Sequence, residues 1–256
     1  MLIRVLKHAW SSLREARTDG GSAVAQEVRP VERSRDENPL AHWYAGHTGR
    51  GIEKWGHFLE IYHRHFKRYR GKSPVVLEIG VSQGGSLEMW RDYFGPGCRL
   101  FGVDIDPRCK TIENENTTIL IGDQSDRGFL AQVRRAVPRL DILIDDGGHV
   151  MNQQIATFEE LYPHIVEDGV YLCEDLHSSY LPKYGGGYRA PGTFMEYSKK
   201  LIDQLNAWYS EDDDDGLEVN DFTRTTCSMH YYDSVLVIEK RSMTPPDTIV
   251  AGAPSF

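Results

Sequence analysis

Apolar residues in the central part of the chain follow two alternating periods. Short apolar runs of four or five residues alternate with segments in which apolar residues recur every three or four positions. The runs, which predict strands, are Val75–Ile79, Arg99–Val103, Thr118–Ile121, Asp141–Ile144 and Gly169–Cys173. The other segments, which predict helices, are Ser86–Tyr93, Asp126–Ala136 and Asn152–Tyr162. This alternation predicts an α/β fold with a Rossmann-like, doubly wound and mostly parallel sheet, covered by helices on both faces.

Further patterns lie on both sides of this central part. Thr193–Trp208 has the period of a helix. Met229–Tyr232 and Ser234–Glu239 are short runs separated by a break, and they predict a C-terminal antiparallel strand pair. Upstream, the aromatic and histidine-rich segment Ala41–Tyr69 contains the pattern of a helix that packs on the core. The residues that carry this pattern are Phe58, Leu59, Tyr62, His65 and Phe66.

The patterns divide the chain into three parts. Residues 1–39 begin with an amphipathic segment, 1–17, and continue as a polar stretch that we expect to be a flexible linker. Residues 40–241 hold the strand and helix patterns and predict one folded domain. Residues 242–256 predict a disordered tail, and the acidic run Glu211–Asp215 predicts a solvated loop.

Composition narrows the class of protein. The 256 residues carry a net charge of −9, so we do not expect nucleic acid as a partner. The four cysteines, at 98, 109, 173 and 227, form no CxxC pair, and they predict reduced thiols in a cytoplasmic protein. No apolar run approaches the roughly 18 residues that a membrane span requires, and the N-terminus has no signal-peptide pattern.

A glycine-rich turn follows the first predicted strand. Glu78 lies near the end of that strand, and Gly80, Gly84 and Gly85 precede the next helix. Glycines let a ligand approach the backbone closely, and a helix N-terminus offers unpaired N–H groups. A tight strand-to-helix turn without a ligand is the alternative. The spacing differs from the G-x-G-x-x-G of nicotinamide-dependent oxidoreductases, which disfavours that class.

Acidic residues also follow the next two strands. Asp104 ends the second strand, where a Rossmann-like site holds ribose hydroxyls, and Asp123-Gln124 follow the third. Clustered carboxylates would repel a pyrophosphate but suit the hydroxyls, amine and sulfonium of S-adenosylmethionine. We therefore predict this cofactor, with Glu78 and Gly80 at its amino-acid end, Asp104 at the ribose and Asp123-Gln124 at the adenine. The expected cofactor contacts are Glu78, Gly80, Val81, Gly84, Ser86, Asp104, Asp123, Gln124 and Asp145.

Three more acids follow the fourth and fifth strands. Asp146 lies just after the fourth strand, and Glu174 and Asp175 follow the fifth. Because the carboxyl ends of parallel strands open onto one crevice, these carboxylates can converge there. Hard oxygen ligands suit Mg²⁺, with Mn²⁺ or Ca²⁺ as alternatives. The other explanation is that the acids are helix caps or exposed loop residues.

Together these motifs resemble the class I S-adenosylmethionine-dependent methyltransferases. Within that class, roughly residues 43–240 are similar to the metal-dependent sugar O-methyltransferases of antibiotic biosynthesis, of the mycinamicin and rhamnosyl-tetracenomycin type. The cephalosporin hydroxylase-like proteins share much of the pattern. The segments that carry the resemblance, beside Asp104, are Glu78–Gly80, Gly85–Leu87, Met89-Trp90, Gly122–Gln124, Ile144–His149, Glu174-Asp175, Ser178–Tyr180 and Tyr184–Gly187.

The resemblance implies a function and a role for several residues. It implies that the folded domain is a methyltransferase domain that acts on a sugar hydroxyl of a glycoside, glycolipid or polysaccharide. Asp146, Glu174 and Asp175 would hold the divalent cation. His149 would take the proton of the hydroxyl, a task that suits the pKa range of histidine. A structural histidine in a turn is the alternative, and His177 is a second candidate for the base.

Two segments are expected to lie near the acceptor. The loop Gly185–Gly187 is either a lid over the acceptor or a plain surface loop. The resemblance implies that the region of Trp43, Tyr44, His47 and Lys54 helps to close the pocket, although simple packing is the alternative. The sequence names neither the acceptor nor the hydroxyl that would be methylated.

Two broader alternatives stay open. An accessory cofactor-binding protein of the cephalosporin hydroxylase-like type would keep the fold without catalysis, although the acids and His149 favour an enzyme. Residues 1–17, which are basic and amphipathic, would either lie on an anionic membrane or pack on a partner subunit. The first would place the cytoplasmic protein at the inner membrane face, and the second accords with the homo-oligomer that we expect.

Overall fold

The structure is a computed structural model that describes residues 38–210 and 216–253. These residues lie within one compact unit, Arg35–Phe256. The predicted amphipathic segment 1–17, the linker up to residue 37 and the acidic run Glu211–Asp215 lie outside the described residues, and so they stay predictions.

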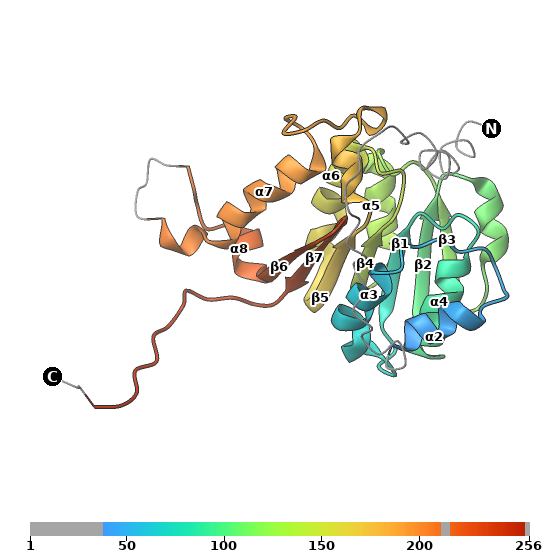
Figure 1. Cartoon of the computed structure of the whole chain (residues 1–256), viewed down its shortest axis with the longest axis horizontal. Coiled ribbons are helices and arrows are strands. Elements are labelled where there is room, and N and C mark those ends of the chain that lie inside the picture. The colour runs from blue at the N-terminus through green and yellow to red at the C-terminus, as the bar shows by residue number, and fades with distance from the viewer. Residues whose placement is uncertain (1–37, 211–215, 254–256) are drawn as a thin grey trace, which may run out of the picture. The chain divides into compact units, whose positions relative to one another are not determined.

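A seven-stranded sheet forms the centre of the described domain (Figure 1). Its strand order is β3-β2-β1-β4-β5-β7-β6. The first five strands in the chain run parallel, whereas β7 pairs antiparallel with both β5 and β6. The strands are β1 (Val75–Ile79), β2 (Arg99–Asp104), β3 (Thr117–Ile121), β4 (Leu140–Asp145), β5 (Ile165–Cys173), β6 (Thr226–Tyr232) and β7 (Val235–Lys240). This topology confirms the predicted α/β, Rossmann-like sheet with a C-terminal antiparallel pair.

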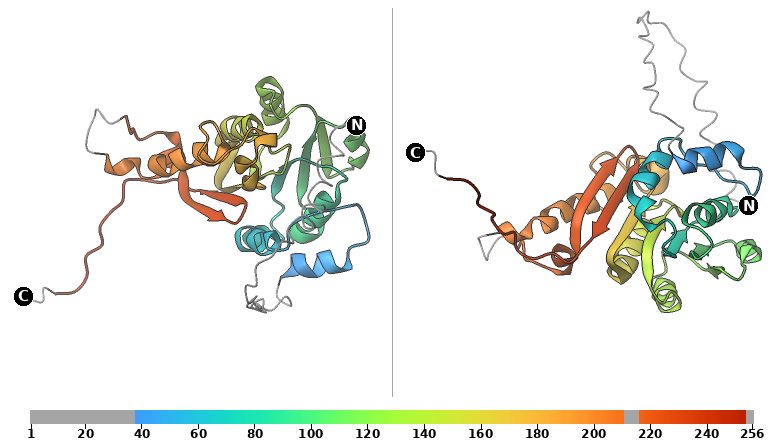
Figure 2. Two further views of the ribbon diagram at one scale, coloured as in Figure 1. Left: turned by 45° about the horizontal axis from the view of Figure 1, so that its top comes forward. Right: turned by 90° about the horizontal axis from the view of Figure 1, so that it is seen from below.

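Helices cover both faces of the sheet. Successive strand residues point to opposite faces, so Val76 and Leu77 belong to two separate apolar clusters. One cluster includes residues of α2 (Pro39–Gly46), α3 (Phe58–Phe66) and α4 (Gly85–Phe94). The other includes residues of α5 (Arg127–Ala136), α6 (Met151–Leu161) and α7 (Phe194–Leu205). Figure 2 shows α2 and α3, in blue and cyan, on one side of the sheet and α5 and α6, in yellow-green, on the other.

Three elements differ from the expectation. Helix α2 begins inside the predicted linker, because Asn38 caps it by accepting a hydrogen bond from the Leu40 backbone and Pro39 suits a first turn. The predicted helix 193–208 ends at Leu205 and continues as a short 3₁₀ turn. A further short helix, α8 (Asp221–Thr225), precedes β6. Two strands also begin earlier than predicted, β5 at Ile165 instead of Gly169 and β6 at Thr226 instead of Met229. The limits of the other strands and helices are close to the predicted ones.

The remaining chain adds little regular structure. Residues 242–253 form no helix or strand, and the predicted disorder of the tail stays a prediction. All four cysteines are free. Among the described residues, no helix has both the length and the apolar character that crossing a membrane requires.

Candidate active site

The glycine-rich turn after β1 brings the ends of β1 and β4 into contact. Gly80 has a φ of +96°, and a Cβ there would lie 2.0 Å from the carbonyl oxygen of Asp146. Only glycine therefore allows the two loops to approach so closely. Ser82 is also in the left-handed region, with a φ of +52°. Gly84, with a φ of +86°, is the N-cap of α4, and the first N–H of that helix, at Gly85, donates to the Gly51 carbonyl at 3.2 Å.

Asp104 lies beside this turn, at the end of β2. Its Oδ2 accepts a hydrogen bond of 2.8 Å from the backbone N–H of Ser82, and its Oδ1 accepts one of 2.9 Å from Asp106. The structure thus joins Asp104, the last residue of β2, to the turn after β1. Val81, which is 2% exposed, packs in the core and presents only its backbone to this edge.

Glu78 lies deeper than the sequence analysis expects. Its side chain is completely buried, because this position of β1 shares a face with Val76 and points toward α4. Oε2 accepts a hydrogen bond of 2.7 Å from the Ser86 hydroxyl, and Oε1 accepts one of 3.3 Å from the Trp90 indole. Burial raises the pKa of Glu78 to about 7, against the opposing charge of Lys54. Glu78 and Ser86 therefore hold each other beneath the turn.

The residues after β3 tie that strand to the loop after β4. Gln124 is 5% exposed, and its Nε2 donates to Asp145 Oδ1 at 2.7 Å and to the Thr157 hydroxyl at 2.9 Å. Its Oε1 accepts from the backbone N–H of Gly148 at 3.1 Å. Asp123 instead accepts from the backbone and hydroxyl of Ser125, which lowers the pKa of Asp123. Gln124 thus acts in the fold as a positioning residue.

Asp145 carries a buried acceptor that is not satisfied. The residue is 1% exposed, and its Oδ2 has no hydrogen-bond partner in the described part of the chain. Burial raises the pKa of Asp145 to about 7, although the Gln124 amide and the Gly147 backbone oppose this shift. A buried unpaired acceptor is costly, and it is commonly explained by a ligand or by a bound proton.

Asp146, His149 and Asp175 form one cluster at the carboxyl ends of β4 and β5. His149 Nε2 lies 3.1 Å from Asp175 Oδ2 and 3.8 Å from Asp146 Oδ1. Its other ring nitrogen, Nδ1, is buried and has no hydrogen-bond partner among the described residues. His149 and Asp175 both have a positive φ, of +57° and +56°. Backbone strain of this kind is typical of functional sites.

Lys54 connects this cluster to Glu174. Its Nζ lies 2.5 Å from Asp146 Oδ2 and 2.8 Å from Glu174 Oε2, and its side chain is only 3% exposed. Burial lowers the pKa of Lys54, but the charges of Asp146 and Glu174 outweigh this effect and hold it well above its usual value. On the other side of Glu174, the Tyr62 hydroxyl donates to Oε1 at 2.6 Å. The sequence predicts Lys54 near the pocket without a role for it, and it predicts Tyr62 as a core residue.

The donor set fits a divalent cation. One ligand atom each from Asp146, His149 and Asp175 lie within 4.8 Å of one another. Glu174, the third carboxylate of the predicted set, is joined to Asp146 through Lys54. Carboxylate oxygens suit hard cations such as Mg²⁺, whereas an imidazole ligand would also suit Mn²⁺.

The other residues that the sequence predicts near the acceptor lie in two places, beside the cluster and at a separate surface pocket. Tyr184, which precedes the loop Gly185–Gly187, contacts the His149 ring edge-on at a centroid distance of 6.2 Å. His177 Nδ1 lies 3.8 Å from Asp175 and 2.7 Å from the Ser234 hydroxyl. Trp43 and His47 are stacked on each other and line a separate surface pocket of about 570 Å³ over α2 and α4. They do not reach the cluster.

Comparison with known proteins links this arrangement to enzymes. No protein-family model matches the chain. Demethylmacrocin O-methyltransferase of Streptomyces fradiae is 35% identical over 202 residues, which cover 73% of this chain and 50% of that protein. The 8-demethyl-8-alpha-L-rhamnosyl tetracenomycin-C 2'-O-methyltransferase of Streptomyces olivaceus is 34% identical over 75% of this chain and 53% of that protein. The chain spans about half the length of these curated relatives.

A solved structure resembles most of the chain. The MycE methyltransferase from the mycinamycin biosynthetic pathway, in complex with Mg and SAH, superposes with a TM-score of 0.69 at 31% sequence identity. The match covers 80% of this chain and 54% of that one. A second MycE structure, which also contains mycinamycin VI, gives a TM-score of 0.68.

Proposed function

We propose that this chain, a homologue of sugar O-methyltransferases with the fold of class I methyltransferases, is an S-adenosylmethionine-dependent O-methyltransferase. It requires a divalent cation and acts on a sugar hydroxyl of a glycoside, glycolipid or polysaccharide. The observation that carries this proposal is the meeting of His149 with Asp146 and Asp175 at 3.8 and 3.1 Å, beside the glycine-rich turn after β1.

The cofactor is proposed to bind across the ends of β1, β2 and β3. Gly80 and Gly84 give the turn its course through their positive φ, and Asp104 is fixed beside the turn by the Ser82 N–H. A ribose diol can donate hydrogen bonds to such a carboxylate. Asp145, with its unpaired Oδ2, offers an acceptor for a donor group of the cofactor. Glu78 and Ser86 support the turn from below, and Val81 contributes through its backbone.

The cation is proposed to bind to Asp146, Glu174 and Asp175. When bound there, it would polarise an acceptor hydroxyl and lower the pKa of that group. Lys54 already carries positive charge between Asp146 and Glu174, and it holds the two carboxylates near each other. Tyr62 fixes the other oxygen of Glu174. Lys54 and Tyr62 are therefore positioning residues of this site.

His149 is proposed to take the proton from the acceptor hydroxyl. A carboxylate 3.1 Å from Nε2 favours the tautomer with its proton on Nε2, which leaves the lone pair on Nδ1. Nδ1 is the nitrogen with no partner among the described residues. The hydroxyl oxygen forms a bond to the methyl carbon, the bond from that carbon to sulfur breaks, and the hydroxyl proton passes to His149. The products are a methyl ether and S-adenosylhomocysteine.

The acceptor is proposed to be a small glycoside or a glycan. MycE has been solved with mycinamycin VI, and a rhamnosyl tetracenomycin enzyme is among the relatives, so macrolide and polyketide glycosides are the first compounds to try. A homo-oligomer and a cytoplasmic location accord with this proposal. Contact with the inner membrane face through residues 1–17 stays a separate prediction, which vesicle flotation with and without those residues would test.

A methyl-transfer assay tests the function. Labelled S-adenosylmethionine and Mg²⁺ are incubated with a panel of rhamnosyl and other deoxysugar glycosides, and label is followed into the acceptor. We expect transfer that excess chelator abolishes and Mg²⁺ restores. The double substitution Asp146→Asn with Asp175→Asn should remove it. Full transfer in excess chelator would rule out the cation, and a chain that binds the cofactor but methylates no glycoside would rule out this acceptor class.

A further inference from the structure

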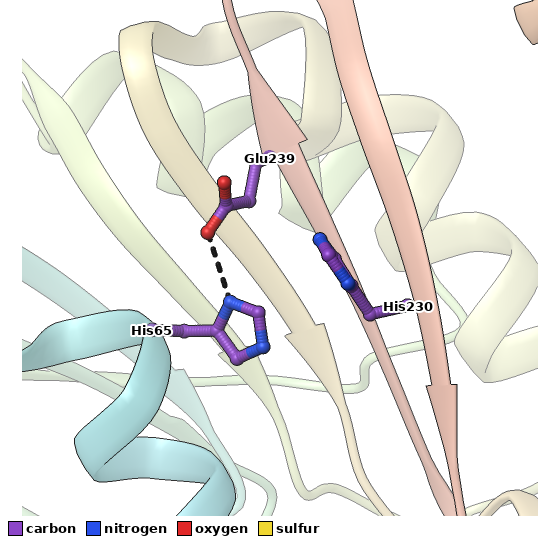
Figure 3. Close-up of side chains that lie close together, drawn as sticks. All are labelled: His65, His230 and Glu239. Carbon is purple, nitrogen blue, oxygen red and sulfur yellow. Dashed lines mark hydrogen bonds and ion pairs between the residues drawn. The ribbon is translucent and has the colours of Figure 1, made fainter.

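A second cluster of metal-ligating side chains lies away from the candidate active site. His65 on α3, His230 on β6 and Glu239 on β7 point toward one another (Figure 3). One ligand atom from each lies within 4.8 Å of the others. His65 Nδ1 is 2.8 Å from Glu239 Oε1, and the two imidazole ring centroids are 4.9 Å apart. The site would thus join a helix to the antiparallel strand pair.

The outer contacts of the two histidines aim the same ring nitrogen at the cluster. His65 Nε2 hydrogen-bonds the Tyr232 hydroxyl at 2.9 Å, and His230 Nε2 hydrogen-bonds the Ser228 hydroxyl at 2.9 Å. A hydrogen bond on one ring nitrogen fixes the tautomer and orientation that present the other to a metal. Nδ1 of each histidine is thereby the nitrogen directed at the cluster. His65 Nδ1 donates to the Glu239 carboxylate at 2.8 Å, and a metal that binds this nitrogen would replace that proton. Such outer-shell support is a regular feature of protein metal sites.

We propose that His65, His230 and Glu239 form a binding site for a transition-metal ion of the zinc type. Two imidazoles and one carboxylate suit Zn²⁺ and similar ions, and poorly suit Mg²⁺, which prefers oxygen ligands. Zinc bonds of about 2.0–2.1 Å would place the ligand atoms roughly 3.3 Å apart, so small side-chain rotations complete the site. Water would supply the fourth ligand.

Burial and charge around the cluster bear on metal binding. His65 is 4% exposed, whereas the side chain of Glu239 is 20% exposed and gives access from solvent. Arg68 lies 3.6 Å from Glu239 Oε1, so a cation at the cluster would compete with this guanidinium for the carboxylate.

Helix α3 connects this site to the candidate active site. His65 lies one turn after Tyr62, whose hydroxyl donates to Glu174. Glu239 pairs in register with Val170, three residues or about 10 Å along β5 from its last residue, Cys173. The site is therefore distinct from the cluster of Asp146, His149 and Asp175 at the carboxyl ends of the strands, which we call the carboxyl-edge site. A metal bound to the histidine site would nevertheless fix α3, the helix that positions Glu174. Its role would be to stabilise the fold and that helix.

Zinc binding to the full chain tests the inference. The protein is freed of metal with chelator, exchanged into buffer with excess Mg²⁺ to occupy the carboxyl-edge site, and titrated with Zn²⁺ by calorimetry. We compare wild type with His230→Ala and with Glu239→Gln, which keeps the hydrogen bond to His65. His63→Ala, on the same helix, is the matched control. Each ligand variant should weaken zinc binding by more than the roughly 10–100-fold typical of an outer-shell loss, and the control should not.

Thermal unfolding supplies a second readout. Zn²⁺ should raise the Tm of wild type and of His63→Ala, and leave the Tm of His230→Ala unchanged. The variant Asp175→Asn should keep the zinc site. The inference is overturned if His230→Ala and Glu239→Gln bind zinc as tightly as wild type, or if Asp175→Asn alone loses it. The latter result would assign zinc to the carboxyl edge.

Discussion

The Lys54 ammonium lies 2.8 Å from Glu174 Oε2, although 120 residues separate the two in the chain. The same nitrogen is 2.5 Å from Asp146 Oδ2. Both acids follow strands of the sheet, whereas Lys54 precedes the first strand. A buried lysine thus neutralises the carboxylates that would hold the cation, and it keeps the strand ends of β4 and β5 together before any cation binds.

Loss of Lys54 should destabilise the cation-free protein. The substitution Lys54→Met leaves two carboxylates close together without their counter-charge, which typically costs about 3–5 kcal/mol for a buried pair. We expect a lower Tm in chelator and a larger gain in Tm from Mg²⁺ than in wild type. Lys199→Met is the matched control, because Lys199 is 46% exposed and pairs with Glu196 on the surface. Equal Tm values for the two variants in chelator would contradict this account.

Asp104 should account for much of the affinity for the cofactor ribose. Asp104→Ala leaves the ribose hydroxyls without their acceptor, which costs about 1–3 kcal/mol, or roughly tenfold to a hundredfold in affinity. Asp106→Ala is the control, since Asp106 lies two residues away but caps a surface turn and pairs with Arg108. Titration with S-adenosylhomocysteine measures both. Unchanged affinity in the Asp104 variant would remove the ribose assignment.

His149 should affect turnover and leave cofactor binding unchanged. Without a proton acceptor, His149→Ala is expected to lose about 10²–10⁴-fold in turnover. His177→Ala is the informative comparison, because His177 also lies close to Asp175. Its ring, however, hydrogen-bonds the Ser234 hydroxyl and stacks on Trp55. We expect it to keep most of its turnover. The assignment is wrong if the His149 variant is fully active or if the His177 variant shows the larger loss.

The sequence predicts the sheet and its acidic edge because both follow from local patterns. Strands buried on both faces are continuous apolar runs, as in Val75–Ile79, which matches β1 at both ends. Strand β5 begins earlier than predicted, at Ile165. The apolar pattern misses this first part because it is half-exposed and its pairing with β4 shifts register there. Acids at the ends of parallel strands meet by topology, which is why Asp146 and Asp175 could be placed together.

The contacts that complete the site follow from tertiary packing instead. Lys54 and Tyr62 lie in a segment whose spacing indicates only a helix on the core, and nothing local points to acids more than 80 residues away. Glu78 was expected at the open edge because it lies near a strand end, yet strand alternation turns it under α4. The cluster of His65, His230 and Glu239 likewise unites three distant segments.

Cofactor and cation are proposed to bind to different carboxylates at the carboxyl ends of the parallel strands, and calorimetry tests this most directly. S-adenosylmethionine is titrated into the full chain once with Mg²⁺ and once with excess chelator. We predict binding at one site with closely similar affinity in both, because the carboxylates proposed for the cofactor, Asp104 and Asp145, are not those proposed for the cation, which are Asp146, Glu174 and Asp175. Binding that chelator abolishes, or no binding under either condition, would contradict the account.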